Sequence, residues 1–175
     1  MADHARRSSP KDCPLLHRFM GIDMDERWVN RTPQTMLETF HWFRGEGFNL
    51  IIEDLLGLSH RAPLISSEPR VIVEGFRLLP HLVKPLLSEF NRAVWLLPTP
   101  EFRHAVLERR GGSAWGFLAK TSNPQIALSN LLERDRMFTE RLRDETARLG
   151  LHTVDVDNTT TEAALTTRVK SLFGL

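Results

Sequence analysis

The sequence predicts a three-layer α/β fold, in which helices cover both faces of a parallel sheet. Three aliphatic runs, at 70–74, 92–97 and 151–157, have the composition of strands, and helical patterns separate them. Strands that alternate with helices form parallel sheets through right-handed crossovers. The runs at 70–74 and 92–97 are continuously apolar, which is typical of strands buried on both faces.

The part of the chain before the first run divides at about residue 30. Residues 1–30 are polar, and we expect an irregular, loosely packed segment there, followed by the α/β domain over 31–175. Residues 31–47 predict a helix that Thr32 caps and Gly45 ends. Residues 48–58 carry one apolar stripe at helical spacing and predict a second helix, closed by Gly57.

After the first run, helix signals precede and follow each strand. Residues 79–90 predict a helix that Pro85 interrupts. Thr99-Pro100 and Asn123-Pro124 have the cap and first-turn residues of helices over 100–110 and 124–149, with a loop between them. Residues 161–173 predict a final amphipathic helix.

Composition limits the class of protein. The chain has 175 residues, of which 41% are hydrophobic and 26% charged, as in one ordinary globular domain. The formal net charge of +1 gives no support for a nucleic-acid partner or an anionic membrane surface. No apolar run approaches 18 residues, and the single Cys13 fits a reducing compartment, so we expect a cytoplasmic protein without a membrane partner.

Four stretches occur in an order that resembles a known family. They are VIVEGF (71–76), AVWLLPTPEFRHAVLERR (93–110), LLERDRMFTERL (131–142) and LGLHTVDVDNTTTEAALTTRV (149–169). This order resembles the P-loop kinases of small molecules, meaning nucleoside monophosphate kinases and shikimate- and gluconate-kinase-like enzymes. More narrowly, the chain looks like actinobacterial ATP-binding, kinase-like proteins. The resemblance implies ATP-dependent phosphoryl transfer to a small hydroxyl- or phosphate-bearing acceptor, with Mg²⁺ and ATP as cofactors.

The same resemblance assigns roles to eight residues. Glu74 takes the place of the acid that binds Mg²⁺ through water, and residues 111–140 take the place of the lid. Arg134 and Arg136 would hold the transferring phosphoryl group. The residues that would contact the nucleotide are Lys120, Asp157, Asn158 and Thr159. Arg77 would bind substrate, although it is offset by one position from the family pattern.

Structural roles compete with several of these assignments. Glu74 could simply form an ion pair at a strand end. The arginines of 131–143 alternate with acids, as on a solvated helix face held by i,i+4 pairs. The aromatic cluster at 40–43 could stack on a substrate base, but core packing is the commoner role of such a cluster. The histidines lack metal-ligand spacing.

The family's phosphate-binding motif is absent from this sequence. The motif is G-x-x-x-x-G-K-[ST], and none of the four lysines, Lys11, Lys84, Lys120 and Lys170, follows a glycine. We therefore expect an N-terminally incomplete member of the family, with three alternatives: a longer native chain, a partner that supplies the missing strand, or a degenerate remnant. The functional prediction is a crippled or truncated kinase, and the alternative is a non-enzymatic pseudokinase or interaction module completed by a partner.

Overall fold

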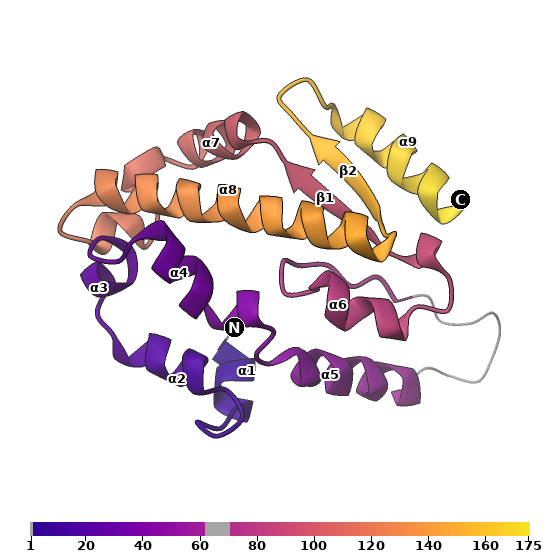
Figure 1. The fold of residues 1–175 in the computed structure, drawn as a ribbon, viewed down its shortest axis with the longest axis horizontal. Helices are drawn as coiled ribbons and strands as arrows, with labels where there is room; N and C mark the ends of the chain where they lie inside the picture. The colour runs from indigo at the N-terminus through magenta and orange to yellow at the C-terminus, as the bar shows by residue number, and fades with distance from the viewer. Residues whose placement is uncertain (1, 62–70) are drawn as a thin grey trace.

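A computed structural model describes residues 2–61 and 71–175, and Figure 1 shows their arrangement. The N-terminal half is a series of helices: α1 (Ala2–Arg7), α2 (Pro14–Gly21), α3 (Met24–Trp28), α4 (Pro33–Thr39) and α5 (Phe48–Arg61). The C-terminal half contains α6 (Pro80–Val83), β1 (Val94–Pro98), α7 (Pro100–Arg109), α8 (Pro124–Leu149), β2 (His152–Val156) and α9 (Glu162–Phe173). Short 3-10 turns join several of these elements.

The predicted three-layer fold with a full parallel sheet is wrong for the described residues. Their sheet has two parallel strands, β1 and β2, in a register that pairs Val94 with His152 and Pro98 with Val156. Helices make up most of the remaining structure, and α3 and α4 pack against α8 instead of flanking a broad sheet (Figure 1).

The predicted strand at 70–74 does not form over its described part, 71–74. Its aliphatic side chains are exposed: Val71 is 50% exposed, Ile72 93% and Val73 40%. A β-branched run becomes a strand only where another strand pairs with it and buries it. No strand of the described residues does so, and residue 70 lies outside the described part of the chain.

Predictions based on local capping signals are confirmed. Thr99 accepts a hydrogen bond from the Phe102 amide at the start of α7, and Asn123 accepts one from the Ile126 amide at the start of α8. Helix α8 then runs for 26 residues to Gly150, which adopts the left-handed conformation (φ 67°) that ends a helix. Strand β2 and helix α9 also fall within their predicted ranges, and β1 forms in its predicted place but ends one residue later, at Pro98.

Other boundaries differ from the prediction. The helix expected over 31–47 ends at Thr39, because Phe40 is extended and a 3-10 turn, His41–Arg44, follows it. Helix α5 continues through Gly57 to Arg61, since a glycine weakens a helix without ending it. Residues 1–30, expected to be irregular, contain α1, α2 and α3, and Leu16 and Trp28 are buried there.

Helix α8 organises the core. It contacts α3, α4, α6, α7 and both strands. One hydrophobic cluster joins Trp28, Leu107 and Leu131, a second joins Phe40, Phe43 and Phe138, and a third joins β1 and Leu151 to the end of α8. Among the described helices, none is both long and apolar enough to cross a membrane.

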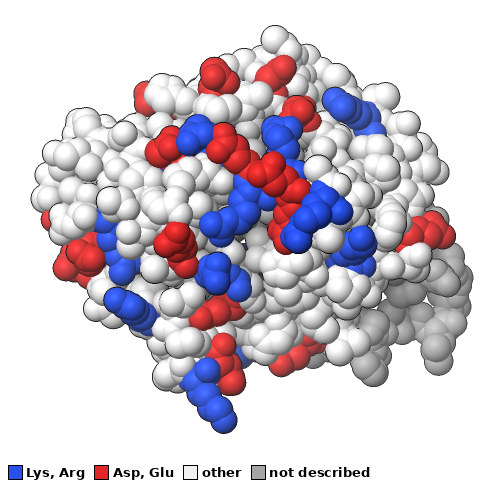
Figure 2. All heavy atoms as spheres, in the orientation of Figure 1, with Lys and Arg blue, Asp and Glu red and all other residues white. Residues whose placement is uncertain are grey.

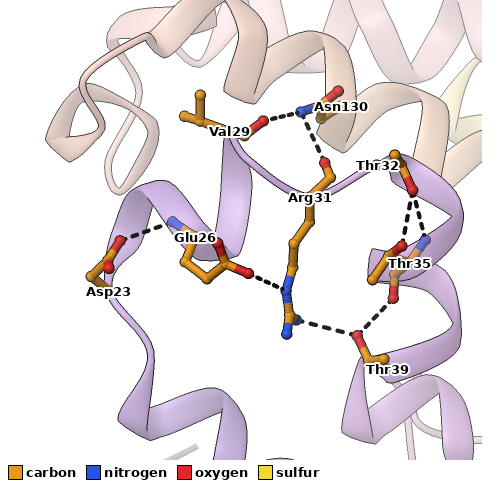
Figure 3. A network of polar contacts seen from close by, with 8 residues as sticks. All are labelled: Asp23, Glu26, Val29, Arg31, Thr32, Thr35, Thr39 and Asn130. Atoms are coloured by element: carbon orange, nitrogen blue, oxygen red, sulfur yellow. Dashed lines mark hydrogen bonds and ion pairs between the residues drawn. The ribbon is translucent and has the colours of Figure 1, made fainter.

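A polar network fixes the turn between α3 and α4 to α8 (Figure 3). The Asn130 side-chain amide on α8 donates to the carbonyls of Trp28 and Val29 at 3.1 and 3.2 Å. Within the turn, Arg31 binds Glu26 and the Thr39 hydroxyl, each at 3.2 Å. The network thereby holds α3 and α4 against α8.

Candidate functional site: an apolar cavity beside β1

A large apolar cavity lies between the N-terminal helices and the strands. Its volume is about 1540 Å³. Its walls include residues of α2, of α5, of the 3-10 turn His41–Arg44, of the 71–78 segment, of β1, and of α8 and α9. The lining side chains are mainly aliphatic and aromatic; they include Phe19, Ile72, Phe76, Leu96, Phe138 and Phe173.

One edge of β1 has no strand beside it within the described part of the chain. The Thr99 amide donates to the Val156 carbonyl at 2.9 Å, so the backbone groups of Thr99 face β2. Successive residues of a strand direct their backbone groups to opposite edges, so those of Leu97 also face β2, and those of Val94 and Leu96 face away. We call this second side the free edge of β1, because no strand of the described residues pairs with it. Val94 and Leu96 both line the cavity.

Arg134 lies in the cavity wall inside an aromatic box. Its guanidinium carbon is 5.2, 4.9 and 5.2 Å from the ring centroids of Trp28, Phe40 and Phe43, and the residue is only 6% exposed. Phe43 also stacks on Phe138, with 3.6 Å between centroids. The box orients the guanidinium through cation–π contacts, which strengthen when the cation is desolvated.

Asp135 joins two arginines at the same wall. Its Oδ1 accepts from Arg134 Nε at 3.1 Å and Nη2 at 2.6 Å, and its Oδ2 accepts from Arg103 Nε at 2.9 Å and Nη2 at 2.7 Å. Two guanidinium groups thus share one carboxylate, which leaves a formal charge of +1 on the trio. Much of the anion-binding capacity of both arginines is used within the protein.

His41 is a second buried polar group among the residues that line the cavity. It is 1% exposed, neither ring nitrogen has a hydrogen-bond partner among the described residues, and the rings of Phe19, Phe40 and Trp42 lie 4.7 to 5.3 Å away. Burial lowers the pKa of His41 to about 4, and the charge of Arg77 contributes in the same direction. His41 is therefore neutral near pH 7.

Glu74 and Arg77 follow the exposed aliphatic segment. Glu74 lines the cavity and is exposed. Arg77 donates to His4 Nδ1 at 2.7 Å and lies 5.6 Å from the Trp42 ring, while His4 Nε2 is 2.8 Å from Asp54. Because Nδ1 accepts from Arg77, the proton of a neutral His4 is on Nε2 and points to Asp54. Arg77 thus links α1 and α5 to the 71–77 segment.

Arg136 lies apart from Arg134. It donates to Glu133 at 2.7 and 2.8 Å and to Glu140 at 2.5 Å, all within α8. The hydrogen bonds with Glu133 raise the pKa of Arg136 and lower that of Glu133. Arg136 lines a smaller cavity of about 390 Å³ at the end of β1. Figure 2 shows positive and negative side chains interspersed over one face of the molecule. Arg136 is paired with Glu133 and Glu140.

The four residues expected to contact the nucleotide are not at either cavity. Lys120 is exposed on a 3-10 turn, and Asp157, Asn158 and Thr159 are exposed in the loop between β2 and α9. Asp157 Oδ1 accepts from the Thr159 amide at 2.9 Å and its hydroxyl at 2.7 Å. These bonds lower the pKa of Asp157 and close a local turn.

The structure therefore brings Glu74 and Arg134 to one cavity and leaves the other predicted site residues outside its lining. The residues that complete the wall, among them Arg103 and Trp28, were not singled out from the sequence. The apolar spacing of Leu16, Phe19 and Met20 was the available signal that the N-terminal segment folds onto a core. Over the described residues, no group of three or more acidic, histidine or cysteine side chains could hold a metal ion.

Comparison with protein-family models, curated proteins and solved structures finds no match for this chain.

Proposed function

We propose that this chain is an interaction module that binds an apolar segment of a partner in the cavity beside β1. The observation that carries the proposal is the coincidence of the cavity with exposed aliphatic and aromatic side chains. Val71, Ile72, Val73, Phe76 and Leu96 all line the cavity and are 40–93% exposed. Exposed apolar patches of this kind mark interaction sites in soluble proteins.

The size and chemistry of the cavity favour a polypeptide over a small polar ligand. Small-molecule pockets usually enclose roughly 300–1,000 Å³ and place a few polar groups to orient the ligand. This cavity encloses about 1540 Å³. Of the polar groups at its wall, Arg134 and Asp135 bind each other, and aromatic rings enclose His41.

The cavity can be tested with the fluorescent apolar probe 1-anilinonaphthalene-8-sulfonate. We expect the folded chain to bind the probe and Ile72→Asp to weaken binding at least fivefold. Ile126→Asp is the matched control, because Ile126 is 45% exposed but does not line the cavity. Near-ultraviolet circular dichroism must show that each variant is folded. Equal binding by wild type and Ile72→Asp would contradict the proposal.

A second candidate function is nucleotide-dependent phosphoryl transfer in an assembly that a partner completes. The observation that favours it is that Glu74 and Arg134 border the same cavity. In such an assembly ATP would supply the phosphoryl group and Mg²⁺ would neutralise its charge. Glu74 would orient a metal-bound water, and Arg134 would add positive charge at the cavity wall.

Titration of the isolated chain with ATP and Mg²⁺ separates the two candidates. The interaction module predicts no binding in the micromolar range, because the described residues contain no glycine-rich backbone cradle for phosphates. Micromolar binding by a folded monomer would reject the interaction module and support the phosphotransferase.

A further inference from the structure

We infer that the partner segment binds as a β-strand along the free edge of β1, in the space bordered by the 71–74 segment. This inference rests on the proposed binding function and specifies its occupant. The partner is an extended, continuously aliphatic segment of about five residues. Recognition would combine main-chain hydrogen bonds to β1 with burial of apolar side chains in the cavity.

The backbone of β1 supplies the first argument. The Val94 and Leu96 amides and the Val94, Leu96 and Pro98 carbonyls face the free edge, as the Thr99–Val156 hydrogen bond and strand alternation require. Unpaired strand edges are templates for another strand. Because β1 has five residues, a matching segment would extend about 17 Å at the usual rise of a strand.

The walls of the cavity supply the second argument. Trp95 and Leu97 belong to an apolar cluster with Leu142 of α8, so one face of β1 is turned to that helix. Leu96, on the opposite face, is 45% exposed. Phe138 and Leu142 of α8 line the cavity, and so do Val169 and Phe173 of α9. A strand added beside β1 therefore meets apolar side chains on both faces, which selects a continuous aliphatic run over an alternating one.

The 71–78 segment supplies the third argument. Its Leu78 carbonyl accepts a hydrogen bond from Trp95 Nε1 at 2.9 Å, which anchors the end of the segment at β1. Before that anchor, Val71, Ile72 and Val73 border the cavity and remain exposed. A strand seated along β1 would cover this β-branched run, whose composition suits packing against another strand.

A fluorescein-labelled peptide, K-K-V-I-V-L-V-K-K, provides a direct probe for the full chain. We expect its fluorescence anisotropy to rise on binding with a micromolar Kd. Leu96→Pro removes an amide from the free edge while sparing the amides that face β2, and should weaken binding at least tenfold. Ile126→Thr, at an exposed position outside the cavity lining, should bind within threefold of wild type.

A modified peptide keeps the test independent of whether Leu96→Pro folds. N-methylation of the peptide at its central valine and both neighbours removes main-chain donors and retains every side chain. Strand addition predicts at least tenfold weaker binding of this peptide to wild type. Equal binding of the two peptides would overturn the inference.

The remaining outcomes separate the inference from the proposed function. If neither peptide binds while the fluorescent probe keeps its dependence on Ile72, strand addition is wrong and the apolar binding function stands. If the probe also fails to bind, both are wrong. A stable dimer in light scattering that the peptide cannot dissociate would identify a second copy of the chain as the occupant and reject a separate partner.

Discussion

Arg134 binds the carboxylate of its sequence neighbour Asp135, with 2.6 Å between Nη2 and Oδ1. Both side chains are largely buried, with 7% and 14% of their surfaces exposed. The opposite oxygen of Asp135 binds Arg103. Arg134 thereby serves as a structural group in the cavity wall, which explains how a charged residue is accommodated among Trp28, Phe40 and Phe43.

Replacing Asp135 by alanine should destabilise the chain by about 3–5 kcal/mol, because it leaves two buried or half-buried guanidinium groups without their shared partner. Urea unfolding followed by circular dichroism measures this change. Glu133→Ala on the same helix is the control. Its pair with Arg136 is exposed, so we expect a change within about 1 kcal/mol. Similar losses of unfolding free energy in the two variants would show that the ion pairs of Asp135 stabilise the fold no more than an exposed ion pair does.

His41 should make stability depend on pH between about 4 and 6.5. Its pKa is about 4 in the folded chain and near 6.5 when unfolded. The unfolded state therefore binds more protons in this interval, and the free energy of unfolding falls as the pH decreases. The expected fall attributable to His41 is on the order of 2–3 kcal/mol.

Urea unfolding at pH 4.5, 5.5 and 7 tests this prediction. His41→Leu should remove that part of the pH dependence and should not lower stability at pH 7, since it eliminates two unpaired buried nitrogens. His104→Leu is the control, because the His104 side chain is 59% exposed. Unchanged pH dependence in His41→Leu would contradict the assignment.

Asn130→Asp should destabilise the chain more than Asn130→Ala. The aspartate keeps the shape but replaces the donor with a negative charge that faces the Val29 and Arg31 carbonyls (Figure 3). We expect a loss of about 1–3 kcal/mol for alanine and more for aspartate. Thermal unfolding measures both. Ser129→Asp, at an exposed neighbouring position, controls for added charge, and equal effects of the two aspartates would argue against the network.

The Glu46 carboxylate should stabilise α2 by accepting hydrogen bonds from backbone amides at the start of that helix. Its two carboxylate oxygens accept from the Leu15 and Leu16 amides at 2.9 Å each, where the first amides of the helix lack internal partners. Glu46→Ala should cost about 1–2 kcal/mol.

The reaction rate of the Cys13 thiol measures how firmly Glu46 holds the start of α2. The thiol is 2% exposed, and burial raises its pKa, with the charge of Glu46 contributing. Reaction with a disulfide reagent should therefore be slow in the native chain and faster in Glu46→Ala as α2 opens more often. A rate unaffected by the substitution would mean that Glu46 does not hold the start of α2.

Local signals account for the elements that the sequence predicted correctly. The Thr99-Pro100 and Asn123-Pro124 starts and the Gly150 stop depend on nearby backbone groups alone, and the structure contains each of them. The 71–74 run has equally strong strand composition. A strand also needs a neighbouring strand to pair with, and a distant part of the chain must supply it. The sequence therefore predicted the two strands that pair with one another and overpredicted the third.

The candidate site was less predictable for the same reason. Glu74 and Arg134 were singled out by resemblance, and both line the cavity. That Arg134 would bind Asp135 within an aromatic box depends on Trp28, from a segment expected to be irregular, and on Phe40 and Phe43. No sequence motif predicts the free edge of β1, because that edge depends on which segments the fold places beside the strand.

Amide hydrogen exchange at Leu96 and Leu97, followed by nuclear magnetic resonance with and without the aliphatic peptide, tests strand addition most directly. Leu97 faces β2 and is 0% exposed, so its amide should be protected throughout. The Leu96 amide should exchange at least tenfold faster in the free chain and become protected when the peptide binds. A Leu96 amide whose exchange the bound peptide leaves unchanged would contradict strand addition at β1.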